Sequence, residues 1–234
     1  MSPLSPLRAI ADLVLPQSCA GCGRRPSPGL CVPCSLTLET REPSLVPAPG
    51  VAVCAAGGAY AGVLSEAIVA YKERGRHDLL RPLAALLARS TMLAFETMLA
   101  FETAPVSPAA PVLVPVPTTF AARRRRGTDH LRPLAELTAR LVGGTVAPCL
   151  RARRRPDSVG LDRAARLRAS RGAYAPRGFG GHGAGRPAGG TAVVIVDDVL
   201  TSGATVNEVA RTLTAMGLRP SGAAVLAAAG RGGN

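Results

Sequence analysis

The most informative segment of this chain is Val193-Val-Ile-Val-Asp-Asp-Val-Leu-Thr-Ser-Gly-Ala-Thr205. It opens with four aliphatic residues, which are typical of a parallel strand buried on both faces. Two carboxylates follow where strand 192–196 is expected to emerge, and a hydroxyl-rich turn then leads into a helical pattern at 206–216. Parallel sheets bind their ligands at the carboxyl ends of the strands. We therefore expect a ligand site immediately after this strand.

The turn after the strand has the composition of a phosphate cradle. Backbone N–H groups of residues 201–205, together with the positive end of the following helix, can bind a phosphate group. Asp197 and Asp198 can accept hydrogen bonds from vicinal ribose hydroxyls, so the stretch predicts a site for a ribose 5-phosphate. In a simpler interpretation, the acids merely end a strand, and Thr205 and Glu208 form a capping box. That interpretation does not explain the pair of acids beside the loop.

Strand-like and helix-like segments alternate beyond a Pro-rich connector at residues 43–50. The predicted strands cover residues 51–60, 112–116, 146–151, 192–196 and 223–227. The predicted helices cover residues 64–71, 79–101, 131–141, 161–171 and 206–216. Strands separated by segments of helix length are typical of a parallel sheet with helices on both faces. The predicted fold class is therefore α/β, with residues 51–234 as the main domain.

Four of the six cysteines form two Cys-x2-Cys knuckles near the N-terminus. Cys19 and Cys22 are followed, after eight residues, by Cys31 and Cys34. This spacing can place four thiolates tetrahedrally around Zn²⁺. Two disulfides are the alternative, which a reducing cytosol disfavours. A four-cysteine site leaves no open coordination position, so we expect structural zinc, in a ribbon that with a short N-terminal helix makes up residues 1–42.

The charge and the aromatic content of the chain narrow the classes of molecule that it is expected to bind. The chain has a formal net charge of +13, and residues 123–177 hold 15 arginines against four acidic residues. A concentrated positive field favours polyanions such as nucleic acids or phosphorylated small molecules. Aromatic residues make up only 3% of the chain, which argues against base-stacking platforms. Apolar stretches fall short of the roughly 18 residues that a membrane span needs, so we expect a soluble, cytoplasmic protein.

The stretch 193–205 resembles the signature for phosphoribosyl pyrophosphate (PRPP) in the type I phosphoribosyltransferases, which has aliphatic residues, two acids and a T-[TS]-G-x-T loop. Together with the double Cys-x2-Cys ribbon, it is similar to the ComF family of competence-associated proteins, which join such a ribbon to a phosphoribosyltransferase domain. The resemblance covers nearly the whole chain. The other segments that carry it are 71–75, 114–117, 123–127 and 151–171.

The resemblance implies a type I phosphoribosyltransferase fold and roles for individual residues. The acids Asp197 and Asp198 match those that bind the ribose hydroxyls. Residues 156–161, with Arg163 and Arg166 after them, look like a mobile hood. The implied catalytic residues are Lys72, which is the only lysine in the chain, Arg126, Asp197 and Asp198. The implied PRPP-binding residues are Val116, Pro117, Asp197, Asp198, Thr201, Ser202, Gly203, Ala204 and Thr205.

Two departures from the family pattern bear on the expected function. Purine-salvage members have an Asp where this chain has Thr201, and residues 151–177 lack a lysine of the orotate type. The resemblance implies transfer of phosphoribose from Mg²⁺-bound PRPP to an unidentified acceptor, linked to DNA uptake. The alternative is a non-catalytic module of the competence machinery that binds PRPP, another nucleotide or single-stranded DNA. In a third interpretation, the arginine-rich tract is only a solvated surface.

Overall fold

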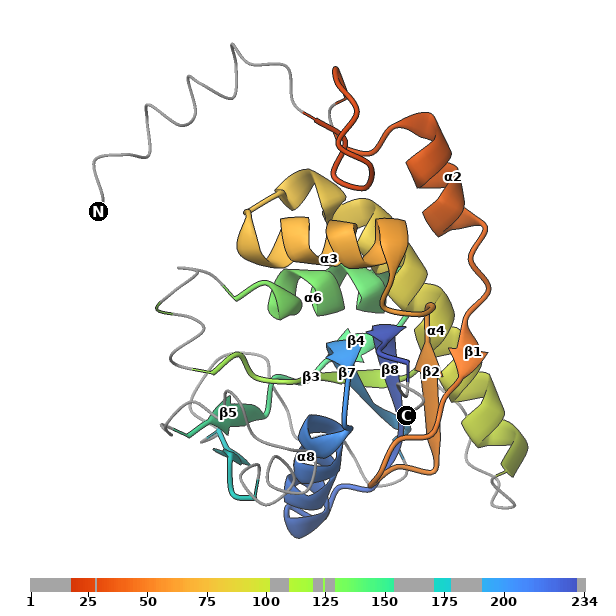
Figure 1. Cartoon of the computed structure of the whole chain (residues 1–234). Coiled ribbons are helices and arrows are strands. Elements are labelled where there is room, and N and C mark those ends of the chain that lie inside the picture. Colours follow the sequence, from red (N-terminus) through yellow and green to blue (C-terminus); the bar gives the residue numbers. More distant parts are fainter. Residues whose placement is uncertain are drawn as a thin grey trace.

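The computed structural model describes residues 18–27, 29–101, 110–119, 124, 129–153, 171–177 and 191–230. Its main sheet is mostly parallel, because only the pairing of its first two strands is antiparallel. In spatial order the strands are β1 (Ser44–Leu45), β2 (Val53–Ala56), β8 (Pro220–Ala228), β7 (Val193–Leu200), β3 (Val112–Pro115) and β4 (Thr145–Val146), as Figure 1 shows. The predicted α/β class is confirmed.

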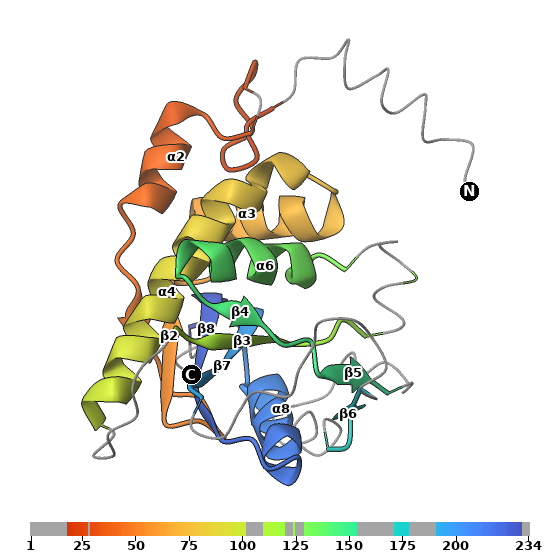
Figure 2. The ribbon, with the colours of Figure 1, turned by 180° about the vertical axis from the view of Figure 1, so that it is seen from behind.

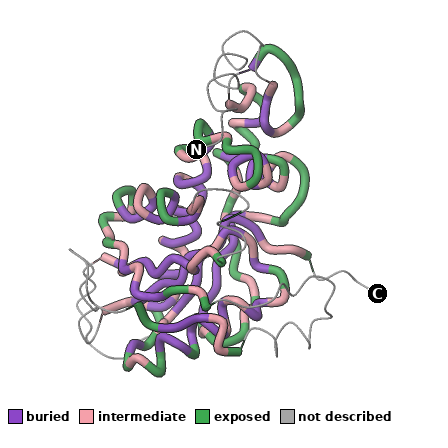
Figure 3. Tube along the Cα trace, turned by 90° about the vertical axis from the view of Figure 1, so that its left-hand side faces the viewer, coloured by how far each residue is buried: buried purple, intermediate pink, exposed green. Residues whose placement is uncertain are grey.

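Helices cover both faces of this sheet. One face carries α3 (Gly62–Glu73), α4 (Leu80–Phe101) and α6 (Leu131–Leu141), and the other carries α8 (Ala204–Ala215) (Figures 1 and 2). The apolar stripe of α3 that the sequence predicted, Leu64, Ile68 and Tyr71, is buried. The aliphatic run that opens β7 is also buried, and buried segments, drawn in purple, fill the centre of Figure 3. The core therefore lies where the hydrophobic pattern placed it.

The connections that follow two neighbouring strands, β3 and β7, lead toward opposite edges of the sheet. The chain leaves β3, forms α6 and returns as β4 on the outer side of β3. It leaves β7, forms α8 and returns as β8 on the opposite side. Neighbouring strands whose connections diverge in this way mark a topological switch point, where α/β sheets form a ligand crevice. The carboxyl ends of β3 and β7 meet at this point.

The structure corrects some of the predicted strand boundaries. The predicted strand 146–151 is two strands, because Pro148 has no N–H for a continuous ladder: β4 belongs to the main sheet, and β5 (Leu150–Ala152) pairs with β6 (Tyr174–Pro176) in a separate antiparallel pair. Strand β7 continues to Leu200 because β8 pairs with it throughout, whereas β3 stops opposite Val196. The predicted N-terminal helix and most of the predicted helix at 161–171 lie outside the described residues.

One helix among the described residues is long and apolar enough to cross a membrane. It comprises the short 3-10 helix η1 (His77–Leu79) and α4, and 56% of its most apolar window is buried. In this fold α4 packs against β2 and β8, as the core helix of a soluble protein does. The finding is consistent with the expected soluble protein.

Candidate functional site

The predicted pair of acids lies at the switch point. Asp197 and Asp198 follow the last β7 residue that pairs with β3, and at this level β7 pairs only with β8. Asp198 faces α3 and the start of α6, because its side chain contacts Lys72 and His130. Asp197 accepts a hydrogen bond of 2.9 Å from the backbone N–H of Asp198. Nothing in the sequence indicated that the two carboxylates have different surroundings.

Asp198 is the centre of a buried polar cluster. Its Oδ2 atom forms an ion pair with Lys72 Nζ, from the last turn of α3, and lies 3.0 Å from His130 Nε2. Its Oδ1 atom accepts a hydrogen bond of 2.8 Å from the backbone N–H of Val199. The structure thus brings together two residues that the sequence singled out, Lys72 and Asp198.

The surroundings shift the pKa values of the two acids in opposite directions. Burial alone would raise the pKa of Asp198, but the hydrogen bond from His130 and the positive charge of Lys72 outweigh burial and hold this pKa well below its usual range. Burial and the negative charge of Asp198 raise the pKa of Asp197 to about 8. Two adjacent carboxyl groups with pKa values this far apart are typical of functional sites.

Sequence reasoning missed His130. This residue lies immediately before α6, and its side chain is 10% exposed. The hydroxyl of Tyr71 donates a hydrogen bond of 2.8 Å to its backbone oxygen, and the two rings meet edge to face. The only available signal was a histidine just ahead of an amphipathic helix, because its contact with Asp198 depends on tertiary structure.

The loop 201–205 connects β7 to the first turn of α8. Helix α8 begins at Ala204 with Gly203 as its N-cap residue, at a φ of 76°. A Cβ atom at Gly203 would overlap the ring of Pro49, so the loop requires glycine here for conformation and for space. Thr205 lies inside the helix, and Glu208 instead accepts a hydrogen bond from Gly172 N and pairs with Arg211. The capping-box interpretation is therefore wrong.

Cavities lie on both sides of this edge of the sheet. At the end of β3, Val116 and Pro117 line a cavity of about 150 Å³, together with three arginines. Those arginines are Arg132, Arg151 and Arg177. On the other side, Thr201 and Ser202 line a cavity of about 390 Å³ with Gly58 and Ala59, which follow β2, and Ala228 at the end of β8. The predicted site residue Arg126, like most of the predicted hood, lies outside the described residues.

The four predicted zinc ligands come together near the N-terminus. The Sγ atoms of Cys19, Cys22, Cys31 and Cys34 all lie within 4.8 Å of one another. The distance between the Sγ atoms of Cys22 and Cys31 is 3.6 Å. A tetrahedral zinc ion with Zn–S bonds of about 2.3 Å requires its sulfur atoms to be roughly 3.8 Å apart. The four thiols could therefore bind one zinc ion.

Backbone N–H groups surround the first of these thiols. The N–H groups of Gly21 and Cys31 donate to Cys19 Sγ, at 3.4 and 3.2 Å. Burial of Cys19 acts to raise its pKa, but backbone hydrogen bonds, that from Cys31 first, outweigh burial and lower it to about 6. The thiolate is the form of cysteine that binds a metal ion.

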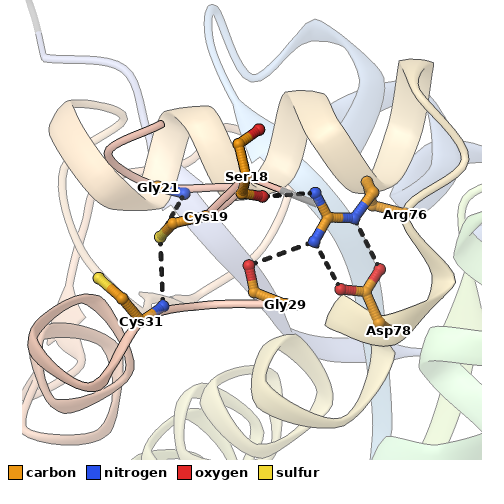
Figure 4. A network of polar contacts seen from close by, with 7 residues as sticks. All are labelled: Ser18, Cys19, Gly21, Gly29, Cys31, Arg76 and Asp78. Carbon is orange, nitrogen blue, oxygen red and sulfur yellow. Dashed lines mark hydrogen bonds and ion pairs between the residues drawn. The ribbon is translucent and has the colours of Figure 1, made fainter. Parts of the chain in front are cut away.

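Arg76 contacts the segment that carries the four cysteines, residues 18–34, which we call the cysteine loop (Figure 4). Its guanidinium donates to the backbone oxygens of Ser18 and Gly29, at 3.0 and 3.2 Å. The same group forms two hydrogen bonds with the Asp78 carboxylate, at 2.8 and 2.9 Å. Arg76 lies just beyond α3, so the helix that carries Lys72 is also the helix against which the cysteine loop is held.

No protein-family model matches this chain, and no curated protein matches it either.

Proposed function

We propose that this protein binds PRPP with Mg²⁺ at the carboxyl ends of β3 and β7 and transfers phosphoribose to an acceptor. One observation carries the proposal. The two acids and the hydroxyl-rich loop 201–205 stand together at the topological switch point, which is where α/β sheets bind nucleotides and their relatives. The resemblance to type I phosphoribosyltransferases implies that the ligand is PRPP. The strand order independently supports a ligand site at this place.

Each residue has a distinct role in the proposed reaction. Loop 201–205 and the N-terminus of α8 hold the 5-phosphate, because backbone N–H groups at a helix start favour an anion. The carboxylates accept hydrogen bonds from the ribose hydroxyls. Carboxylate and ligand oxygens suit Mg²⁺, whose chemistry here is to neutralise charge on the leaving pyrophosphate. The bond from C1 to pyrophosphate breaks as the bond from C1 to the acceptor forms, and catalysis arises from positioning and from cationic side chains.

Isothermal titration with Mg²⁺ and PRPP tests the binding step. We expect saturable binding to the parent, and at least tenfold weaker binding to Asp198→Asn, because a charge-assisted hydrogen bond is lost. Equal affinity of the two proteins would refute the site. Release of pyrophosphate is then measured across a panel of nucleobases. Binding without release from any acceptor would favour the non-catalytic module instead.

We further propose that Zn²⁺ at the four cysteines is structural. The metal would be bound by all four thiolates and would hold the loop 19–34 together, leaving no coordination position for a substrate. A link to DNA uptake through competence proteins follows from the family resemblance alone. Single-stranded DNA remains an alternative ligand, which the same titration can compare with PRPP.

A further inference from the structure

The Asp198 carboxylate has two partners of different accessibility. Lys72 reaches it from α3 with a side chain that is 25% exposed, whereas the His130 side chain is 10% exposed. Both contact the same oxygen, Oδ2. The lysine is therefore the partner that is more accessible to a ligand from solvent, and the histidine is the more buried of the two.

Several contacts fix His130 in place. Its backbone oxygen accepts the Tyr71 hydroxyl, and its ring packs edge to face on the Tyr71 ring, with 6.5 Å between the centroids. The preceding residue, Asp129, accepts a hydrogen bond of 2.9 Å from Thr118, which lies three residues beyond the end of β3. His130 is thus bonded directly to α3, and its neighbour Asp129 is bonded to the segment after β3.

The chemistry of the partner identifies which nitrogen of the His130 ring donates the hydrogen bond. An ionised carboxylate only accepts hydrogen bonds, so Nε2 must carry a proton to bond with Asp198. The other nitrogen, Nδ1, is buried and has no hydrogen-bond partner among the described residues. Nε2 is therefore the ring atom that holds the carboxylate.

We propose that His130 is a positioning residue for Asp198, and that Lys72 is an exchangeable partner which moves from Asp198 to the anionic groups of the ligand. The inference rests on the proposed function, because it gives Asp198 a ribose hydroxyl to bind. When the ligand takes the place of Lys72 on Oδ2, the Nε2–H of His130 still holds the carboxylate. The freed ammonium then lies next to the ligand, where it can bind a phosphate or pyrophosphate oxygen.

The lone lysine makes the exchange observable. Protein labelled with ¹³C- and ¹⁵N-lysine gives one lysine side-chain signal by NMR, which is that of Lys72. We expect this signal to shift on addition of Mg²⁺ and PRPP as the ammonium changes partners. An unchanged Lys72 signal in PRPP-saturated protein would overturn the exchange.

Paired variants test the role of His130. In His130→Gln the side-chain amide can replace the Nε2–H donor, whereas His130→Phe removes the donor and keeps a ring. We expect PRPP affinity within about threefold of the parent for Gln and at least tenfold weaker for Phe, in keeping with loss of a hydrogen bond to a charged group. His77→Phe is the matched control, because His77 packs against the same Tyr71 ring but is exposed. Equal losses for Gln and Phe, or none for Phe, would overturn the role.

The NMR spectrum of the ligand-free protein tests the role of His130 independently of the proposed function. In His130→Phe the Lys72 signal should shift without any ligand, because Lys72 becomes the only basic partner of Asp198. If the parent fails to bind PRPP, the proposed function and the exchange fail together. The positioning role is still decided in that case, because an unshifted ligand-free signal in folded His130→Phe would refute it. Should the Phe variant not fold, a Gln variant that folds and keeps the parent signal supports the role, and one that alters the signal refutes it.

Discussion

Arg76 donates a hydrogen bond of 3.2 Å to the backbone oxygen of Gly29, a residue between the two cysteine knuckles. The same side chain bonds to Ser18, immediately before the first knuckle. The cysteine loop is thus held from outside as well as by its own thiols. Nothing in the sequence pointed to this contact, because an arginine beyond a helix is common in a chain so rich in arginine.

Replacing Arg76 should weaken metal binding although it is not a ligand. In Arg76→Gln the carbonyl contacts and the pair with Asp78 are lost, so the loop is less ordered before metal arrives. We expect zinc affinity to fall about tenfold, the lower end of the range for partners that orient metal ligands. Competition with a chromophoric chelator measures this. Arg81→Gln, an exposed arginine on α4, is the control, and equal zinc affinity in both variants would contradict the prediction.

Purified protein should contain one zinc ion per chain, and Cys34→Ser should lose it. The hydroxyl of serine is a poor zinc ligand, and structural zinc sites depend on all four thiolates. Elemental analysis measures the metal content. Cys149→Ser, which changes a buried cysteine outside the cluster, should retain zinc. The main sheet should keep its cooperative melting in Cys34→Ser, and its collapse would show that the cysteine loop is needed for the whole fold.

Asp198→Asn should destabilise the protein as well as weaken PRPP binding. Removing one partner of a buried ion pair leaves the other charge uncompensated, at a cost of about 3 kcal/mol. Here the uncompensated group is Lys72, with His130 beside it. Denaturant unfolding measures the loss. In the double variant Asp198→Asn, Lys72→Met, much of the stability should return while PRPP binding stays weak. If the double variant is no more stable than Asp198→Asn, the unpaired charge of Lys72 is not the cause of the lost stability.

Asp197 should make stability fall as the pH rises. Its pKa is about 8 in the fold, against 3.8 without the protein environment. The folded state therefore binds the proton more tightly, and this stabilisation is complete below 3.8 and lost as the pH rises through 8. In Asp197→Asn the decline between these values should be reduced. Unfolding curves from pH 5 to 9 test this, and Glu96→Gln, an exposed carboxyl on α4, should behave as the parent does.

Two glycine substitutions, one in loop 201–205 and one after α6, separate the effect of backbone strain from that of crowding. Gly203 and Gly143 both have positive φ angles, but only Gly203 has a neighbour, Pro49, where a Cβ atom would go. Gly143→Ala should cost about 1 kcal/mol from conformation alone. Gly203→Ala should cost clearly more and also weaken PRPP binding. Equal losses of stability would show that Pro49 moves aside.

The sequence predicted features that depend on local pattern. The run of aliphatic residues before Asp197 identified the central strand, and the spacing of Leu64, Ile68 and Tyr71 identified the buried face of α3. It did not predict that β7 runs past its neighbour β3, because strand ends depend on pairing between distant segments. For the same reason His130 was missed, since its partner belongs to another part of the chain.

Helix α3 and the turn after it contact both candidate sites. The helix places Lys72 on Asp198, and the turn after it places Arg76 on the cysteine loop. If a metal ion at the cysteines alters the affinity for a phosphorylated ligand, the ligand must alter the affinity for the metal by the same factor. The supply of metal would then change the affinity of the protein for the ligand. The abundance of the ligand would in turn change the affinity for the metal.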